Sequence, residues 1–274
     1  MGQSPNRYLN EPRLYELSTQ VAAFEALQFG GWAIAGTETI FRPEGGGQPQ
    51  DHGSVEVCGI RHKVAGLHKA GGRVFVHLPG LMEQPLKGIP IEMAIDSNRR
   101  DRLSKSHTLQ HMFSAVTHRV MPGVEVVETG VFEDASGAWI SLKHDDVALE
   151  PLYQIDRQVR SIVLRGTPVW VQKLKSVEHC EWEFGSLLRS DSKASLSGKV
   201  RVVVIEDFDA NCCSGTHWHS SNVGPYEMKA VPVDETDNLM RLEFRLRDAW
   251  MYWYPDAGPM KKLDRPEAID LSAT

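Results

Sequence analysis

Residues 102–120 read RLSKSHTLQHMFSAVTHRV, and in this stretch the sequence changes from strand-like to helical patterning. Its apolar residues recur at the spacing of one helix face, and Pro122 and Gly123 then provide a stop signal. These apolar residues are Leu103, Leu109, Met112, Phe113, Val116 and Val120. The pattern predicts a helix over residues 102–120, with Ser104 or Ser106 as a capping residue near its start.

The sequence before about Asp96 alternates between short apolar runs and turns rich in Gly, Pro and polar residues. The runs are residues 32–34, 54–57, 73–78 and 90–94. Runs of this length and spacing are typical of a small β-barrel or a curled antiparallel sheet. We therefore predict that residues 1–95 form a small β-barrel domain.

The sequence after the helix mixes strand-like runs with one further helical pattern over residues 151–164. The strand-like runs are residues 124–132, 138–142, 168–174, 199–205 and 239–246. Because strands and helices do not alternate regularly, we predict an α+β domain over residues 96–254. Residues 255–274 are rich in Pro, charged and small residues and are expected to be a loosely held tail. The preceding aromatic cluster of Trp250, Tyr252, Trp253 and Tyr254 is expected to be a domain-packing or dimer contact.

The formal net charge of −6 argues against a protein that coats nucleic acid non-specifically, because phosphate binding needs clustered Lys and Arg. No DNA binding is expected. A local patch for RNA remains, formed by Arg99, Arg100, Arg102 and Lys105 at the start of the predicted helix. The alternative for this patch is an ordinary solvated helix face.

No run of about 18 apolar residues is present, so the sequence predicts no membrane-spanning helix and no membrane partner. The N-terminus, MGQSPNRYLNEPRLYEL, has no apolar signal-peptide core, so no export is expected. Two of the four cysteines, Cys212 and Cys213, are adjacent, which does not suit a disulfide framework. These features predict a cytoplasmic protein with reduced thiols.

Two short motifs carry the residues of a predicted metal site. His107 and His111 stand four residues apart in the predicted helix, so both imidazoles project from one face. Cys213-Ser-Gly-Thr-His217 follows a strand-like run, and its Gly and Thr allow a tight turn in which the thiolate and the imidazole face one point. Three imidazoles and one thiolate suit tetrahedral Zn²⁺. Cys212 is an alternative ligand, or a small side chain that only packs.

A glycine-rich loop, Phe41-Arg-Pro-Glu-Gly-Gly-Gly-Gln-Pro-Gln-Asp-His-Gly53, lies between the first two apolar runs. Three successive glycines are costly in any regular element. We therefore expect a loop whose backbone turns sharply or closely approaches another part of the protein.

Together, His107-Thr-Leu-Gln-His111, Cys213-Ser-Gly-Thr-His217 and the glycine-rich loop resemble the motifs of the AlaX proteins, free-standing relatives of the editing domain of alanyl-tRNA synthetase. The resemblance covers residues 8–244. It implies a zinc-dependent deacylase that hydrolyses the ester of a mischarged aminoacyl-tRNA, namely seryl-tRNA(Ala) and also glycyl-tRNA(Ala). The remaining residues leave no room for an aminoacylation domain, so we expect the protein to act in trans, as a monomer or a homodimer.

Such a hydrolase must place water, polarise the ester carbonyl and hold the terminal ribose. Gln48 and Asp51 are the predicted non-metal catalytic residues, which would bind the substrate amino group or water; the alternative is that both satisfy backbone amides in a turn. Thr129, in a strand expected to face the zinc helix, is the candidate partner of a substrate hydroxyl. Its alternative role is strand packing. The basic patch is then expected to bind tRNA phosphates.

The sequence also departs from the family pattern beside the metal motif. The family has Cys-Gly-Gly-Thr-His, whereas Ser214 replaces the first Gly here, and Cys212 precedes the motif. These departures leave two alternatives open. One is a deacylase for tRNA that carries a non-protein or hydroxylated amino acid, as a resistance function. The other is a non-catalytic, zinc-stabilised tRNA-binding module, because a site with four protein ligands is often structural.

Overall fold

The fold is described by a computed structural model over residues 6–143, 149–189, 199–234 and 238–248. The aromatic cluster at Trp250, Tyr252, Trp253 and Tyr254 and the predicted tail, residues 255–274, lie outside these ranges. Among the described residues, no helix is both long and apolar enough to cross a membrane.

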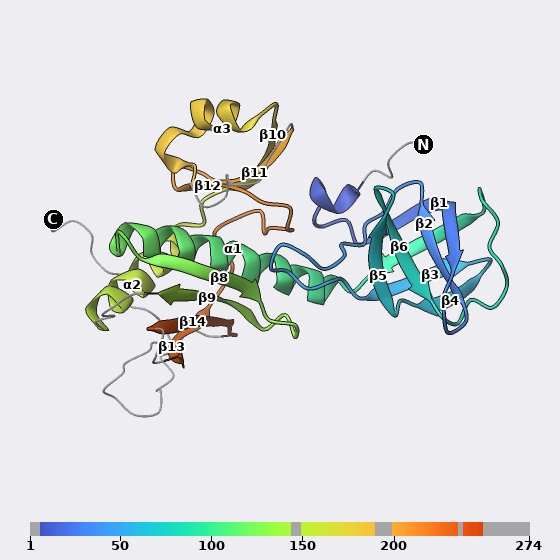
Figure 1. Ribbon diagram of the computed structural model, residues 1–274, viewed down its shortest axis with the longest axis horizontal. Coiled ribbons are helices and arrows are strands. Elements are labelled where there is room, and N and C mark those ends of the chain that lie inside the picture. The colour runs from blue at the N-terminus through green and yellow to red at the C-terminus, as the bar shows by residue number, and fades with distance from the viewer. Residues whose placement is uncertain (1–5, 144–148, 190–198, 235–237, 249–274) are drawn as a thin grey trace.

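The N-terminal part is a seven-stranded antiparallel sheet that curls around an apolar core (Figure 1). The strand order is β4-β3-β7-β1-β2-β6-β5. The strands are β1 (Glu16–Ala26), β2 (Trp32–Gly36), β3 (Gly53–Val57), β4 (Ile60–Lys63), β5 (Gly66–Ala70), β6 (Arg73–Leu78) and β7 (Pro90–Ile95). A short 3₁₀ helix, η1 (Arg7–Leu9), precedes them.

The curled sheet is a half-barrel, so the predicted small β-barrel takes the form of the curled antiparallel sheet that the pattern also allowed. Its edge strands are β4 and β5, and no strand pairing in the described part of the chain joins them. The side chains of β4 are mostly exposed, so this strand has no apolar face that could line the interior of a closed barrel. The four predicted apolar runs correspond to β2, β3, β6 and β7.

Helix α1 (Ser97–Val120) leads from the curled sheet into the second part of the fold and lies along the length of the molecule (Figure 1). It begins five residues before the predicted start at residue 102. Asp96 is its N-cap, with its carboxylate accepting a hydrogen bond from the amide of Arg99 at 2.9 Å. Ser104 and Ser106 both lie inside the helix, so neither is a capping residue.

A four-stranded antiparallel sheet packs against α1 and α2 (Leu149–Arg165). Its order is β13-β14-β9-β8. The strands are β8 (Glu125–Val131), β9 (Gly137–Lys143), β13 (Tyr226–Asp234) and β14 (Leu239–Leu246). Alternate residues of β9, namely Ala138, Ile140 and Leu142, are fully buried against the helices, as strand geometry requires for a sheet with one covered face.

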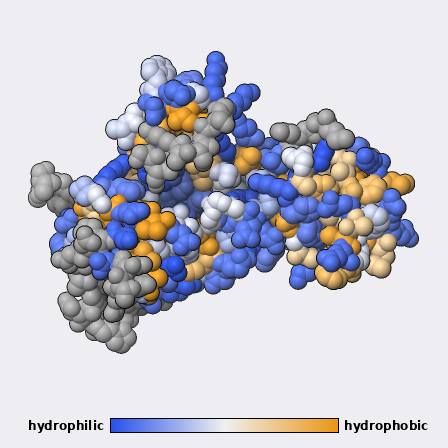
Figure 2. All heavy atoms as spheres, viewed as in Figure 1, coloured by the Kyte–Doolittle hydropathy of each residue, from blue (hydrophilic) through white to orange (hydrophobic). Residues whose placement is uncertain are grey.

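A three-stranded antiparallel sheet, β10 (Val169–Leu174), β11 (Val200–Ile205) and β12 (Asp209–Cys212), completes the described fold. The short helix α3 (Val177–Phe184) and the 3₁₀ helix η2 (Gly185–Leu187) cover one of its faces with a small apolar core. The molecule is thus of mixed α+β architecture. Hydrophobic side chains gather on the curled sheet, whereas hydrophilic ones cover the middle of the molecule (Figure 2).

Candidate metal centre

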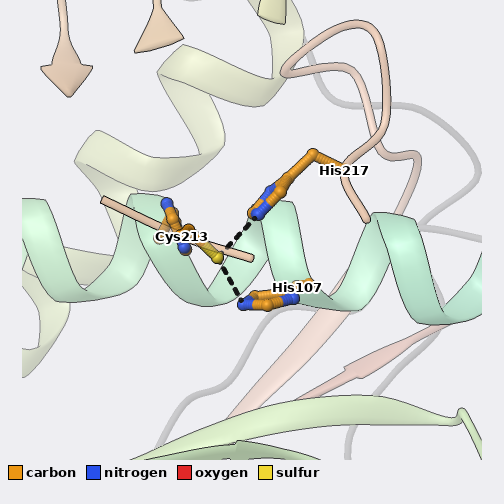
Figure 3. Close-up of side chains that lie close together, drawn as sticks. His107, Cys213 and His217 are labelled. Carbon is orange, nitrogen blue, oxygen red and sulfur yellow. Dashed lines mark hydrogen bonds between the residues drawn. The ribbon is translucent and has the colours of Figure 1, made fainter. Parts of the chain in front are cut away.

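Four side chains that are far apart in sequence converge beside α1. His107, His111, Cys213 and His217 each offer one ligand atom, and these atoms all lie within 4.8 Å of one another. The sulfur of Cys213 is 3.6 Å from Nε2 of His107 and 3.4 Å from Nε2 of His217 (Figure 3). Ligands at ordinary Zn–N and Zn–S bond lengths in a tetrahedron would have N and S about 3.6 Å apart. The cluster could therefore hold a metal ion, and its donor set suits Zn²⁺.

The strand β12 decides which of the two adjacent cysteines belongs to the cluster. Cys212 is paired with Val202 and Ala210 with Val204, so these side chains share the face of the sheet that packs beneath α3. The next residue, Cys213, must point the other way because strand side chains alternate. Cys213 thus packs against the α1 core, where the three histidines lie.

Each histidine has a polar neighbour at its outer nitrogen. Nδ1 of His107 is 2.9 Å from Oε1 of Gln48, and Nδ1 of His217 is 3.2 Å from Oγ1 of Thr108. Nδ1 of His111 faces the buried carboxylate of Asp209 at 3.8 Å. Such partners hold the imidazole with Nε2 directed at a metal.

Of these outer partners, only Gln48 was singled out from the sequence. Thr108 lies within the His107–His111 motif, so its place in that motif could have identified it from the sequence. Asp209 had no local signal, because its contact with His111 depends on the packing of β12 against α1.

Gly215 provides the space that His107 occupies. A Cβ atom at this position would stand 2.1 Å from Cε1 and 2.3 Å from Nδ1 of the His107 ring. Both distances are far below van der Waals contact, so any side chain at this position would displace the imidazole. The cluster thus needs a glycine at position 215, whereas Ser214 beside it is exposed.

Burial lowers the pKa of all three histidines, because the charged form loses its hydration. It brings the pKa of His107 to about 3, with the cations of Arg42 and Arg201 acting in the same direction. The imidazoles are therefore neutral near pH 7, which is the form that binds metals. Burial raises the pKa of the Cys213 thiol, whereas the Gly215 amide and the two arginines lower it.

The glycine-rich loop connects the metal cluster to the strand β8. The guanidinium of Arg42 donates to the carbonyls of Gly45 and Gln48, which holds the loop in a tight turn. The carbonyl of Gly47 accepts a hydrogen bond from Val131 in β8 at 2.7 Å, and a Cβ at Gly47 would stand 3.0 Å from the carbonyl oxygen of Thr129. The loop therefore approaches β8 closely, as three successive glycines suggested.

Gln48 is a buried member of the cluster's surroundings. Its Oε1 accepts from the Thr216 amide at 3.0 Å, and its Nε2 donates to Oγ1 of Thr216 at 2.9 Å. Together with its contact to His107, these bonds engage both ends of its amide. Gln48 thus positions a candidate metal ligand, and its predicted role toward the substrate amino group or water stays a prediction.

Asp51 holds its carboxylate in a buried ion pair, and its predicted catalytic role stays a prediction. The side chain is 2% exposed, and its oxygens accept from Arg100 and from the backbone amide of Arg42. Arg100 is completely buried and also donates to the carbonyls of Pro12 and Ile40. Asp51 lies in the glycine-rich loop and Arg100 lies in α1, so the ion pair connects these two segments. Each buried charge is tolerated because the other neutralises it.

The same pair involves Arg100, which belongs to the predicted RNA-binding patch and is fully buried. Arg99 binds the backbone and the carboxylate of Glu133, whereas Arg102 is exposed. Nζ of Lys105 lies 4.6 Å from the centre of the Trp218 ring. Nε of Arg102 also donates to the carbonyl of Ala135 at 3.2 Å, and the role of the patch in binding tRNA stays a prediction.

Thr129 lies on the face of its sheet that α1 covers. It is paired with Ile140, and directly opposed residues of an antiparallel pair point to the same side. Ile140 is buried against α1, so the half-buried side chain of Thr129 points to that side too. This position agrees with the expected face, and the role of the hydroxyl stays a prediction.

Most of the chain is similar in sequence to one part of a group of longer enzymes. No protein-family profile matches it. It is 31% identical over 240 residues to the alanine–tRNA ligase of Korarchaeum cryptofilum, which covers 86% of this chain and 26% of that enzyme. The alanine–tRNA ligase of Pyrococcus abyssi is 32% identical over 262 residues, which covers 93% of this chain and 27% of that protein. The chain thus spans about a quarter of the length of these curated relatives.

Proposed function

We propose that this protein is a zinc-dependent aminoacyl-tRNA deacylase, which removes serine and also glycine from mischarged tRNA(Ala). The observation that carries this proposal is the buried cluster of His107, His111, Cys213 and His217 within a region similar to alanine–tRNA ligases. An aminoacyl-tRNA is an activated ester, so its hydrolysis needs a placed water and a polarised carbonyl but no covalent nucleophile. We further propose that the protein acts in trans, as the free-standing editing proteins do.

The four side chains of the cluster would hold the zinc ion. When bound, zinc supplies Lewis acidity toward the ester carbonyl or lowers the pKa of a water. The chain's own contribution is orientation. Gln48 and Thr108 hold His107 and His217 at their Nδ1 atoms, and the absence of a side chain at Gly215 leaves room for the His107 ring.

Selection against alanine is proposed to depend on a hydroxyl partner. A deacylase of this kind must spare correctly charged alanyl-tRNA, and size alone separates serine from alanine by only about 1–3 kcal/mol. A polar group that pairs with the serine hydroxyl discriminates better, because alanine leaves it unpaired. We assign this role to Thr129, since it lies on the α1 side of β8 and its backbone adjoins the glycine-rich loop.

Hydrolysis of a panel of charged tRNAs tests the proposal. Purified protein should release serine from seryl-tRNA(Ala) much faster than alanine from alanyl-tRNA(Ala), and a chelator should abolish the release. Hydrolysis of only a non-protein or hydroxylated aminoacyl-tRNA would assign the protein to the resistance function. Binding without hydrolysis of any ester would identify a zinc-stabilised binding module, the alternative that four protein ligands favour.

A further inference from the structure

A cleft with a volume of about 800 Å³ opens beside the metal cluster. One wall is formed by residues 10–14, which precede β1, and another by the exposed edge of β10. The base includes His217, Trp218 and His219, so one metal ligand is also part of the cleft wall. In space-filling view the outline of the molecule is indented between the β10–β12 lobe and the curled sheet (Figure 2). This volume is within the range of sites for small organic ligands.

Trp218 is the fixed aromatic surface of this cleft. Its backbone amide donates to Oγ1 of Thr108 at 3.0 Å, and part of its ring packs against the α1 core. The ring of His219 lies beside it, with a centroid distance of 4.7 Å. Because the hydrogen bond and the core contact both hold Trp218, the indole offers a pre-positioned surface for a flat ligand.

The cleft also carries positive charge. The guanidinium carbon of Arg13 lies 5.4 Å and Nζ of Lys105 lies 4.6 Å from the centre of the Trp218 ring. Lys173, on β10, lines the same cleft and is exposed. The one carboxylate in the wall, that of Glu11, is bound by Arg7 at 2.5 and 2.8 Å. The net charge at the cleft is therefore positive, although the whole chain is negative.

We infer that this cleft binds the single-stranded 3′ end of tRNA, with the terminal base stacked on Trp218 and the adjoining phosphates paired with Arg13 and Lys105. The inference rests on the proposed function, because the ester to be cleaved is attached to the terminal ribose. A nucleotide bound beside His217 would place that ribose next to the metal ligands. Both cations lie over the Trp218 ring, so a base that stacks there would take their place and leave them for the adjoining phosphates. Aromatic rings combined with cations are the usual means of binding single strands, because every base has a flat face and every link has a phosphate.

Equilibrium binding of uncharged RNA tests the inference independently of hydrolysis. The probe is an RNA hairpin that copies the acceptor stem and ends in a single-stranded 3′ tail, compared with the same hairpin without the tail. We expect the tailed hairpin to bind more tightly. Replacing Trp218→Leu should weaken its binding about 10-fold, and Trp218→Phe should retain most of the affinity. Trp182→Leu is the matched control, because Trp182 is 80% exposed on α3 and does not line the cleft.

Two cation variants keep the test valid if Trp218→Leu, next to a metal ligand, loses zinc or unfolds. Arg13→Met and Lys105→Met should each weaken binding and reduce the salt dependence, by about 0.7 in the log–log slope for one phosphate contact on a single strand. Lys87→Met, an exposed lysine outside the cleft, should change neither quantity. Zinc content and melting temperature are measured for every variant.

Specific results would overturn the inference. Equal affinity for the tailed and blunt hairpins would do so, as would unchanged affinity and salt slope in Arg13→Met and Lys105→Met. Competition by free adenosine monophosphate at the same concentration as the tailed hairpin would assign the cleft to a free nucleotide instead.

A different result would show that the proposed function is wrong. In that case the tailed hairpin would bind in a Trp218-dependent manner, but no charged tRNA would be hydrolysed. Hydrolysis of seryl-tRNA(Ala) with binding insensitive to all three cleft substitutions would overturn the inference alone.

Discussion

At the scale of single residues, Gly215 leaves the space that a candidate metal ligand, His107, occupies. A Cβ at this position would stand 2.1 Å from the His107 ring, so Gly215→Ala should displace the imidazole. We expect zinc affinity to fall about 10-fold or more, which is the effect of disturbing the support of a metal ligand. Competition with a chromophoric chelator measures it. Ser214→Ala is the control because Ser214 is exposed, and equal zinc affinity in both variants would contradict the assigned contact.

The two adjacent cysteines should behave differently. Cys213→Ala is expected to lose most of its zinc, because its sulfur lies 3.4 and 3.6 Å from two ligand nitrogens. Cys212→Ala should retain zinc, since Cys212 faces the small core under α3. Metal analysis of both purified variants decides between them. Zinc retained by Cys213→Ala and lost by Cys212→Ala would reverse the assignment.

Thr129→Val keeps the shape of the side chain and deletes its hydroxyl. If the hydroxyl pairs with the serine substrate, the ratio of seryl- to alanyl-tRNA(Ala) hydrolysis should narrow about 10-fold or more, which corresponds to one hydrogen bond worth at least ~1.4 kcal/mol. Single-turnover rates on both substrates give the ratio. Zinc content is measured alongside, and Gln48→Leu serves as a comparison because it should weaken zinc binding through His107. A constant ratio in Thr129→Val would place selection elsewhere.

At the scale of elements, the pair of Asp51 and Arg100 fastens the glycine-rich loop to α1. Asp51→Asn removes one charge and leaves Arg100 buried without its counter-ion. We expect the free energy of unfolding in urea to fall by about 3 kcal/mol or more, because breaking a buried pair strands the other charge. Glu133→Gln is the control: it breaks the pair with Arg99, but Glu133 is exposed, so the loss should stay below about 1 kcal/mol. A similar loss of unfolding free energy in the two variants would show that the buried pair stabilises the fold no more than the exposed pair does.

The elements also show where sequence patterns succeed and where they fail. Helix α1 was predicted because its apolar residues keep the helical repeat, and its start was placed too late because residues 97–101 are polar and only Asp96 caps them. Strand β1 was not predicted. Burial alternates along its first half, where Thr19 and Val21 are buried, but the register shifts between Val21 and Ala23 and the alternation ends there.

At the scale of the whole molecule, a metal held by the cluster would connect two distant parts of the chain. Two of the four candidate ligands lie on α1, and the other two lie in the loop that follows β12. A metal that binds only the folded state stabilises it, by about 4 kcal/mol at a thousand times its dissociation constant. Removal of zinc by a chelator should therefore lower the melting temperature by about 10 °C, since a domain of this size shifts about 2–4 °C per kcal/mol.

Calorimetry with and without chelator measures this shift, and added zinc should reverse it. Cys213→Ala should melt at the same temperature in both conditions, because it has lost a ligand. An unchanged melting temperature of the wild-type protein after its zinc has been removed would show that the cluster contributes nothing to the fold.

The sequence alone pointed to the three histidines of the candidate centre and to one of two adjacent cysteines. Residues four apart on a helix must share a face, and a Cys and a His separated by a short Gly-containing turn must approach each other, so local geometry was sufficient. The tertiary structure decided the rest. It showed that Cys213 and not Cys212 faces the cluster, that Asp51 and Arg100 neutralise each other, and that Trp218 lines a basic cleft. Each of these facts depends on contacts between segments far apart in the chain, and such contacts arise from packing, which no local pattern encodes.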